Sequence, residues 1–261
     1  MCGSGIFKVS TSLETLNLHM CGGIWDQAPF PSLPNLKNLR ITYSRLSEKD
    51  LKAILSCCNG LCTFVYEAAD PCSIPNSRDH FHASSIIKYL SYYHETLKSL
   101  KLDLRRLRWS PVSNGQNTQA AFSFQAFTAL EHLFLNSSEL YSCFLTESPA
   151  ESLLVQRLPP SITTLRLAGH IGYGLPHLAK GLLALADAAL QGQFPRLEQV
   201  RCDAEQNLDE HHVSTMFSAA GVDFGYSRWP LGEATLRDSD VPPLSTPSPH
   251  LPLPSDTDSD L

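Results

Sequence analysis

One short pattern of apolar residues recurs along the chain and constrains the fold more than any other feature. The pattern is apolar-x-x-apolar-x-apolar, as in LETLNL, LKSLKL and ITTLRL, and its copies begin at Leu13, Leu36, Leu61, Leu97, Leu130, Ile162 and Leu197. The copies at Leu61 and Leu197 are weaker, because an aromatic residue or a cysteine replaces a leucine. Repeats of about 20 to 50 residues are typical of solenoids, propellers and arrays, in which each unit buries its apolar face against its neighbours.

The spacing within each copy predicts a β-strand followed by a helix. The last two apolar positions are two residues apart, so a strand would bury both and turn the residue between them to solvent. Between the strands, apolar residues recur at helical spacing, as in Leu51, Ile54 and Leu55. Further helices are expected within 84–97, 150–158, 175–191 and 209–221, the last stopped by Gly221. Alternating strands and helices predict an α/β solenoid, with a curved parallel sheet on the concave side and helices on the convex side.

The first copies also carry the residues of a known repeat. The pattern L-x-x-L-x-L-x-x-C-x-x-I is matched by Leu13, Leu16, Leu18, Cys21 and Ile24. On these residues the chain resembles the leucine-rich-repeat family, in its cysteine-containing subtype, and LKNLRITYSRLSEKDLKAILSCCNGL looks like one complete unit. Later copies depart from the pattern, since the Cys or Asn position is held by Ser44, Arg105, Ser138, His170 and Glu205. The resemblance spans about residues 13–226 and about seven repeats.

Irregular arrays of this kind are similar to the C-terminal, substrate-reading region of F-box proteins, especially the divergent ones of filamentous fungi. The resemblance implies a non-enzymatic protein-recognition module that reads substrates for an F-box-type ubiquitin ligase. No F-box pattern is visible in this chain, so a ligase adaptor is expected as a partner only if the complete gene encodes one. The alternative is a free-standing leucine-rich-repeat scaffold or adaptor with no ligase role.

Composition favours a globular protein inside the cell. A chain of 261 residues that is 43% hydrophobic can bury a large core. It has no secretory signal and no run of roughly 18 to 20 apolar residues, which predicts a cytoplasmic or nuclear protein. The eight irregularly spaced cysteines favour reduced thiols over a disulfide framework. The net charge of −6 argues against non-specific binding to nucleic acid or an anionic membrane.

The two ends of the chain differ from the array. Residues 1–12 are expected to be an N-terminal lead-in, and VDFGYS from Val222 is expected to be a short closing strand at the end of the array. Residues 227–261 contain seven of the 18 prolines and predict a disordered tail rich in Pro, Ser and Asp. The TPSP sequence in this tail offers proline-directed phosphorylation at Thr246 and Ser248.

Several clusters of reactive residues have a structural interpretation. Cys57, Cys58, Cys62 and Cys72 lie near His80 and His82, but no C-x-x-C pair is present, so we expect no metal. The DEHH sequence at 209–212 is expected to start a helix, where acidic residues suit the dipole. No nucleophile elbow, phosphate-binding loop or dinucleotide fingerprint occurs, so no catalytic residue, cofactor or enzyme activity is expected. The basic stretch KSLKLDLRRLRW offers phosphate contacts, although a solvated strand edge is the simpler interpretation.

The residues between the last two apolar positions give the candidate binding site. Read across the copies, this position is held by Asn17, Arg40, Val65, Lys101, Phe134, Arg166 and Arg201. The position two residues earlier is uncharged and polar in every copy if His132 is neutral. We therefore predict that Arg40, Lys101, Phe134, Arg166 and Arg201 bind an acidic or phosphorylated segment of a protein partner. The alternative is that Asp103 and Asp203 pair with Lys101 and Arg201 on a solvated sheet.

Overall fold

The computed structural model describes residues 12–22, 30–44, 46–68, 83–104, 122–136, 140, 152–169, 175–204, 208 and 210–228. The predicted lead-in, except for its last residue, and the predicted tail beyond Arg228 lie outside these residues. The phosphorylation candidates Thr246 and Ser248 therefore remain predictions from sequence.

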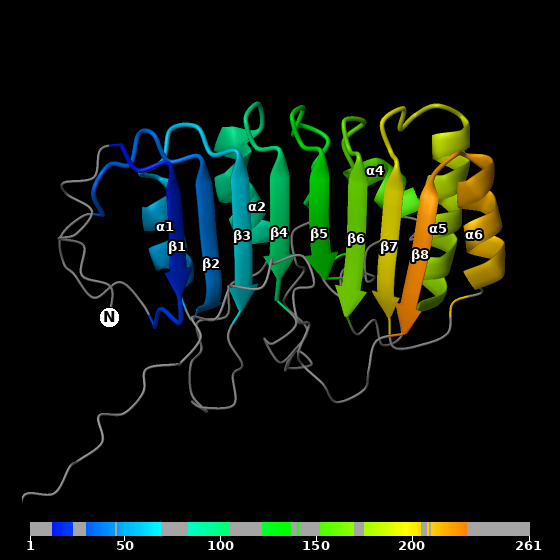
Figure 1. The fold of residues 1–261 in the computed structure, drawn as a ribbon, viewed down its shortest axis with the longest axis horizontal. Helices are drawn as coiled ribbons and strands as arrows, with labels where there is room; N and C mark the ends of the chain where they lie inside the picture. Colours follow the sequence, from blue (N-terminus) through cyan, green and yellow to red (C-terminus); the bar gives the residue numbers. More distant parts are fainter. Residues whose placement is uncertain are drawn as a thin grey trace, which may run out of the picture. The chain divides into compact units, whose positions relative to one another are not determined.

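Eight parallel strands form one open sheet, and their order in the sheet follows their order in the chain (Figure 1). Each strand pairs only with the strands before and after it, as expected for a repeat array. The predicted α/β solenoid is thereby confirmed. The strands are β1 (Thr15–His19), β2 (Asn38–Ser44), β3 (Thr63–Ala68), β4 (Ser99–Asp103), β5 (His132–Asn136), β6 (Thr164–Gly169), β7 (Gln199–Ala204) and β8 (Asp223–Arg228).

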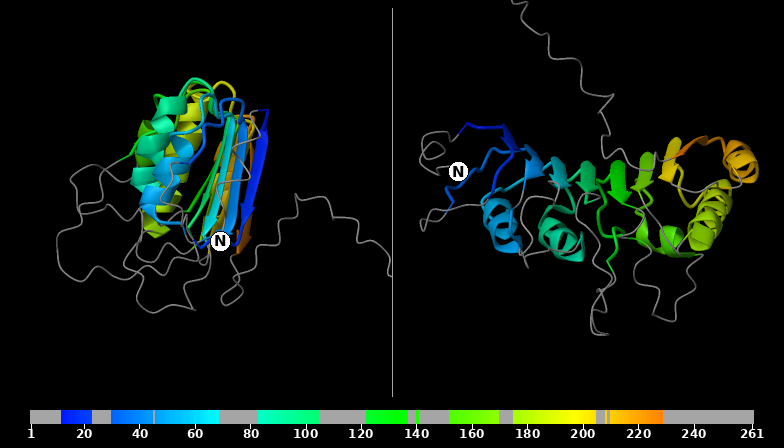
Figure 2. Two further views of the ribbon diagram at one scale, coloured as in Figure 1. Left: turned by 90° about the vertical axis from the view of Figure 1, so that its left-hand side faces the viewer. Right: turned by 90° about the horizontal axis from the view of Figure 1, so that it is seen from below.

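The helices between the strands lie on one face of this sheet, and the sheet bends so that its other face is concave (Figure 2). Within the described residues, no helix is long and apolar enough to cross a membrane.

Several helices are shorter than their sequence patterns predict, and the second one ends in a 3-10 turn. The helices are α1 (Glu48–Leu55), α2 (Ala83–Leu90), the 3-10 turn η3 (Ser91–Tyr93), α4 (Leu153–Arg157), α5 (Leu175–Leu190) and α6 (Glu210–Ala219).

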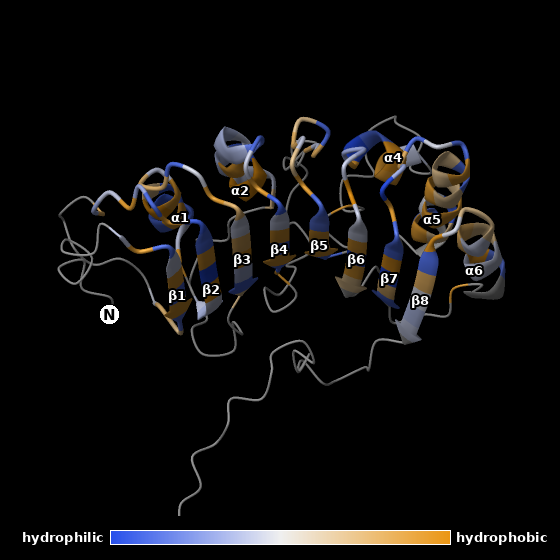
Figure 3. Ribbon diagram, turned by 45° about the horizontal axis from the view of Figure 1, so that its top comes forward, coloured by the Kyte–Doolittle hydropathy of each residue, from blue (hydrophilic) through white to orange (hydrophobic). Residues whose placement is uncertain are grey.

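The recurrent apolar positions build the core between the sheet and the helices. The strand leucines predicted to stack lie in one register row, which runs Leu16, Leu39, Phe64, Leu100, Leu133, Leu165, Val200 and Phe224. All of them except Phe224, on the last strand, are buried. Hydrophobic and hydrophilic residues alternate along the strands (Figure 3), as required when only one face of each strand is buried.

A repeated backbone contact keeps successive strands in register. The carbonyl of Glu14 accepts hydrogen bonds from the amides of Lys37 and Asn38, at 2.9 and 3.0 Å. The carbonyl of Lys37 accepts the same pair of bonds from the amides of Cys62 and Thr63. The contact recurs at later strand starts, so equivalent residues of neighbouring repeats lie side by side across the sheet.

The predicted closing strand after the seven repeat copies is confirmed, and it is the eighth strand of the sheet. VDFGYS does not carry the leucine pattern, yet it forms β8 and pairs with β7 in parallel along its whole length. The ring of Phe224 stacks on Phe217 of α6, with centroids 5.2 Å apart. Gly221, at φ 73°, ends α6 just before the strand, as its position in the sequence predicts. The last helix and strand thus form a terminal unit whose core contact is aromatic.

Candidate functional site

The five predicted binding residues lie in one row on the concave face. Strand register aligns Arg40 with Val65, Lys101, Phe134, Arg166 and Arg201 on successive strands. Asn17 and Gly225 occupy the two ends of the same row. The row therefore crosses the whole sheet, and we call it the middle row.

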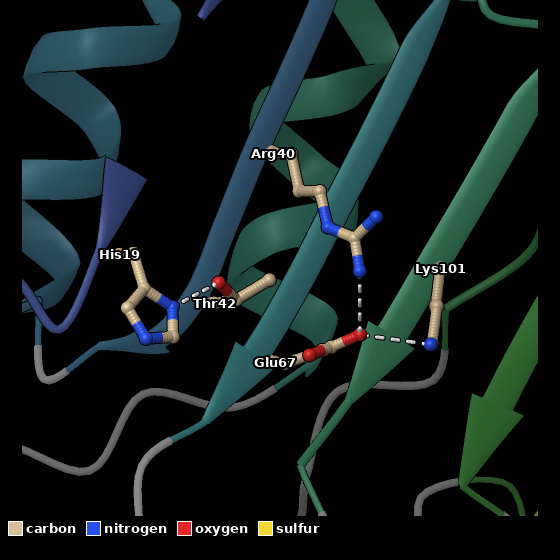
Figure 4. Close-up of polar contacts among 5 residues, drawn as sticks. All are labelled: His19, Arg40, Thr42, Glu67 and Lys101. Carbon is tan, nitrogen blue, oxygen red and sulfur yellow. Dashed lines mark hydrogen bonds and ion pairs between the residues drawn. The ribbon is translucent and has the colours of Figure 1, made fainter. Parts of the chain in front are cut away.

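In the first half of the middle row, two cations share one carboxylate. Lys101 Nζ lies 2.8 Å from Glu67 Oε1 and donates a hydrogen bond to it. Arg40 Nη2 lies 3.8 Å from the same oxygen, on the other side of β3 (Figure 4). The carboxylate of Glu67 thus joins three neighbouring strands through their side chains.

In the second half, each cation has a carboxylate of its own. Arg166 donates through both Nε and Nη2 to Asp203 Oδ2, at 3.1 and 3.0 Å. Arg201 donates through Nη2 to Asp223 Oδ2 at 2.5 Å. Bonds between charged partners are the stronger class of hydrogen bond, so both arginine side chains are held in fixed directions.

These contacts correct the pairing that sequence alone suggests. Asp203 pairs with Arg166 and not with Arg201, whose partner is Asp223 on β8. Every pair is diagonal, because each carboxylate lies on a neighbouring strand and two residues along from the position opposite the cation. A diagonal neighbour is about 7 to 8 Å away in a sheet, which suits a long arginine or lysine side chain.

Two carboxylates that sequence reasoning missed, Glu67 and Asp223, lie beside the middle row, as does Asp203, which it assigned to another cation. Glu67 and Asp203 belong to a third row, two residues further along each strand, which is also visible in the repeat pattern. Asp223 belongs to the first row, but only the eighth strand brings it there. Examining all three outward positions of each repeat, instead of two, would have identified Glu67 from the sequence.

Phe134 occupies the middle row between two cations. Lys101 Nζ lies 5.3 Å and Arg166 Cζ lies 5.7 Å from the centroid of its ring. Both distances fall within the range of a cation–π contact. Only 8% of Phe134 is exposed, so this apolar residue is buried on the polar face of the sheet.

The concave face is balanced in charge. Its described outward positions carry four cations and four anions, namely Arg40, Lys101, Arg166, Arg201, Glu67, Asp103, Asp203 and Asp223. The carboxylates of Glu67 and Asp203 are 15% and 11% exposed, while the side chains of Arg40 and Arg166 are 39% and 37% exposed. At these two pairs the guanidinium lies nearer to solvent than its carboxylate.

Gly225 gives Arg201 the room to reach its partner. A Cβ atom at Gly225 would lie 2.6 Å from Arg201 Nη1, so the guanidinium lies directly over this part of β8. Hydrogen bonds from Arg201 and Gln199 lower the pKa of Asp223 below its usual value. Because Asp223 is 62% exposed, its carboxylate stays well hydrated in this contact.

The polar row that precedes the middle row has hydrogen bonds across strands. Asn38 Nδ2 donates to Thr15 Oγ1 at 3.2 Å, and His132 Nδ1 lies 2.9 Å from Thr164 Oγ1. These groups therefore have defined positions beside the charged pairs.

Each of the other predicted clusters lies partly outside the described residues. No group of three potential metal ligands occurs among the described residues, and Cys72, His80 and His82 lie outside them. Cys58 is buried after α1, where burial raises the pKa of its thiol to about 12. The arginines and the tryptophan of the basic stretch, from Arg105 onward, also lie outside the described residues.

The chain matches no protein-family model, and no curated protein is significantly similar to it in sequence.

Proposed function

We propose that the chain is a non-enzymatic protein-recognition module that binds its partner on the concave face of the sheet. One observation carries this proposal: among the described residues, all helices cover the convex face, and none covers the concave face (Figure 2). Parallel sheets are usually covered on both faces, and repeat solenoids use an open concave face for binding. The charged pairs and hydrogen bonds of this face hold its side chains in place before a partner arrives, which reduces the entropic cost of binding.

The partner that this face suits best carries an acidic or phosphorylated segment. Because its charges balance, the face as a whole does not attract anions. Its preference for acidic partners therefore depends on which charged groups are the more exposed. At Arg40 and Arg166 these groups are guanidinium donors, because the carboxylates beneath them are more buried. Guanidinium donors match carboxylate and phosphate oxygens. The ring of Phe134 lies between Lys101 and Arg166 and supports both cations from within the face.

As the biological role we propose substrate reading for an F-box-type ubiquitin ligase. The support is the repeat architecture together with the resemblance of the repeats to those of F-box proteins. A free-standing scaffold would use the same concave face and would differ only in lacking a ligase adaptor among its partners.

A site-specific photo-crosslinker tests the binding face. We would place it at His132, an exposed residue near the centre of the concave face, and at the matched control Tyr92, which is 84% exposed and follows α2 on the helix side. Crosslinks from living cells should concentrate at His132 and should weaken when Arg40 and Arg166 are changed to Gln.

Equal crosslinking from both positions, unaffected by the Gln changes, would contradict binding on the concave face. Copurification of the complete gene product with a ligase adaptor subunit then separates the two roles. A stable complex supports substrate reading, and its absence supports a scaffold.

A further inference from the structure

The carboxyl ends of β1 and β2 place two large apolar side chains in solvent. Met20 is 73% exposed and Tyr43 is 37% exposed. They occupy equivalent positions in successive repeats, since they directly follow His19 and Thr42, which are paired in the register of the two strands. The exposure is therefore a shared feature of two repeats.

The backbone at both residues is in the left-handed region. Met20 has φ 55° and Tyr43 has φ 50°, and no other non-glycine residue of the described chain has a positive φ. This conformation is unfavourable for residues with a side chain, so it persists only where the surrounding structure enforces it. Such positions cluster at functional sites.

A buried set of hydrogen bonds enforces the turn. The register of β2 and β3 shifts between Ile41 and Ser44, which is a β-bulge that redirects the extra residue of β2. Ser44 Oγ accepts a bond from the amide of Cys21 at 3.0 Å and donates to the carbonyl of Thr42 at 2.9 Å. The hydroxyl of Tyr66 donates to the Ser44 carbonyl at 3.2 Å.

Tyr43 adjoins the first half of the middle row through His19, the residue that precedes Met20. The rings of His19 and Tyr43 meet edge to face with centroids 5.3 Å apart, and His19 Nδ1 lies 2.8 Å from Thr42 Oγ1. Figure 4 shows His19 and Thr42 beside the cluster of Arg40, Glu67 and Lys101. Arg40 lies on the same strand as Tyr43, three residues earlier in the sequence.

We infer that Met20 and Tyr43 form an apolar anchor site for an extended protein segment bound on the concave face. The bound segment carries a large apolar side chain that packs on Met20 and Tyr43. About three residues from it, the segment carries an acidic side chain that contacts Arg40. Tyrosine is enriched among the residues that dominate binding energy, and methionine adapts to differently shaped apolar groups. This inference rests on the proposed function, because it divides the same face into an apolar and an acidic subsite.

Exposed apolar residues elsewhere lack these features. Tyr92 and Leu190 are also largely exposed, but neither has a positive φ, and both lie on the helix side of the sheet. Single exposed apolar residues are common on protein surfaces and carry no implication of binding. Tyr92 therefore provides a matched control for the experiment.

The test selects peptides from a random phage-displayed library on the immobilised full chain and measures their affinity by fluorescence anisotropy. Selected peptides should share a large apolar residue spaced about three positions from Asp or Glu. The double variant Met20→Asn and Tyr43→Asn should weaken their binding by about tenfold or more. Because asparagine tolerates positive φ, the melting temperature should be unchanged or raised. Tyr92→Asn should leave the affinity unchanged.

A second variant tests whether Arg40 is the residue that contacts the acidic side chain of the peptide. Arg40→Gln should remove the preference for Asp or Glu in the selected peptides while the apolar residue is retained. Peptides that bind the double Asn variant as tightly as the wild type, but lose affinity when Arg166 and Arg201 are changed to Gln, would overturn this inference and leave the proposed function standing. Failure to select any peptide that depends on the concave face would overturn both.

Discussion

The two faces of the sheet differ in how regularly their residues repeat, although the same strands form both. On the face that packs against the helices, nearly every repeat places a leucine or another large apolar residue in each row, and these residues are buried. On the concave face, the middle row changes from Asn17 to Arg40, Val65 and Lys101 within four strands. Repetition on one face specifies the fold, whereas the residues on the other face vary from strand to strand.

The faces also differ in how charge is treated. On the helix-facing side the buried residues of the strands are mostly apolar, whereas the concave side holds four cations in pairs with carboxylates. The pairs differ in how deeply the carboxylate is buried, because Asp203 is buried while Asp223 is largely exposed. The concave face therefore combines parts that matter for stability with parts that do not, and substitutions should separate the two.

The largest expected effect is on the helix-facing side. Leu133 is buried in the middle of the stacked row, so Leu133→Ala should lower the free energy of unfolding by about 2 to 5 kcal/mol through lost burial and a cavity. Urea denaturation followed by circular dichroism measures this change. Leu190→Ala, at an exposed position of α5, is the control and should change it by less than about 0.5 kcal/mol. A similarly small effect at Leu133 would mean that the register is wrong.

An intermediate effect should distinguish the two ion pairs of the concave face. Arg166→Met keeps an unbranched stem beside Phe134 but leaves the buried carboxylate of Asp203 without two hydrogen bonds, which should cost about 1 to 3 kcal/mol. Arg201→Met releases Asp223 to solvent and should cost much less, because ion pairs between exposed groups contribute little to stability. Urea denaturation of the two variants measures the difference. Equal losses would show that burial of the carboxylate does not set the importance of the pair.

The smallest effect should be seen only in the titration of Asp223. Its pKa is held below the usual value by Arg201 and Gln199, so this pair stabilises the fold above the ordinary carboxyl pKa, and the contribution is lost as pH falls through the lowered pKa. Gly225→Ala places a Cβ against Arg201, so the arginine should move away and the pKa of Asp223 should rise towards that of an ordinary aspartate. NMR titration of the carboxyl carbon measures both values. An unchanged pKa in the variant would show that Arg201 keeps its contact by another path.

Much of the fold could be predicted from sequence because the signal is repeated. The spacing around Leu36 or Leu130 identifies one strand, and its recurrence identifies the parallel sheet and its buried row. β8 carries no such repetition, since its core contact is the stacking of Phe224 on Phe217, and it was recognised only as a closing strand. Helix lengths were overestimated because apolar periodicity continues into turns, as it does from α2 into η3.

The candidate site was predictable in its position and not in its contacts. The alignment of Arg40, Lys101 and Arg166 follows from the repeat, so the middle row could be read from sequence. The outward turn of Tyr43 could not, because the periodicity contains no sign of the left-handed backbone or of the bulge that redirects it. Tyrosine in a strand pattern is more often a core residue, as Tyr66 is here.

The sequence by itself determined the order of strands, the buried face and the row of residues on the concave face. These depend on local spacing, which each repeat carries in full and which the next repeat continues. The tertiary structure decided which carboxylate neutralises which cation, because Asp203 reaches Arg166 across 37 residues only when two strands lie side by side. It also decided how deeply each charge lies, since burial depends on every neighbouring strand and helix, and no single segment of the chain contains that information.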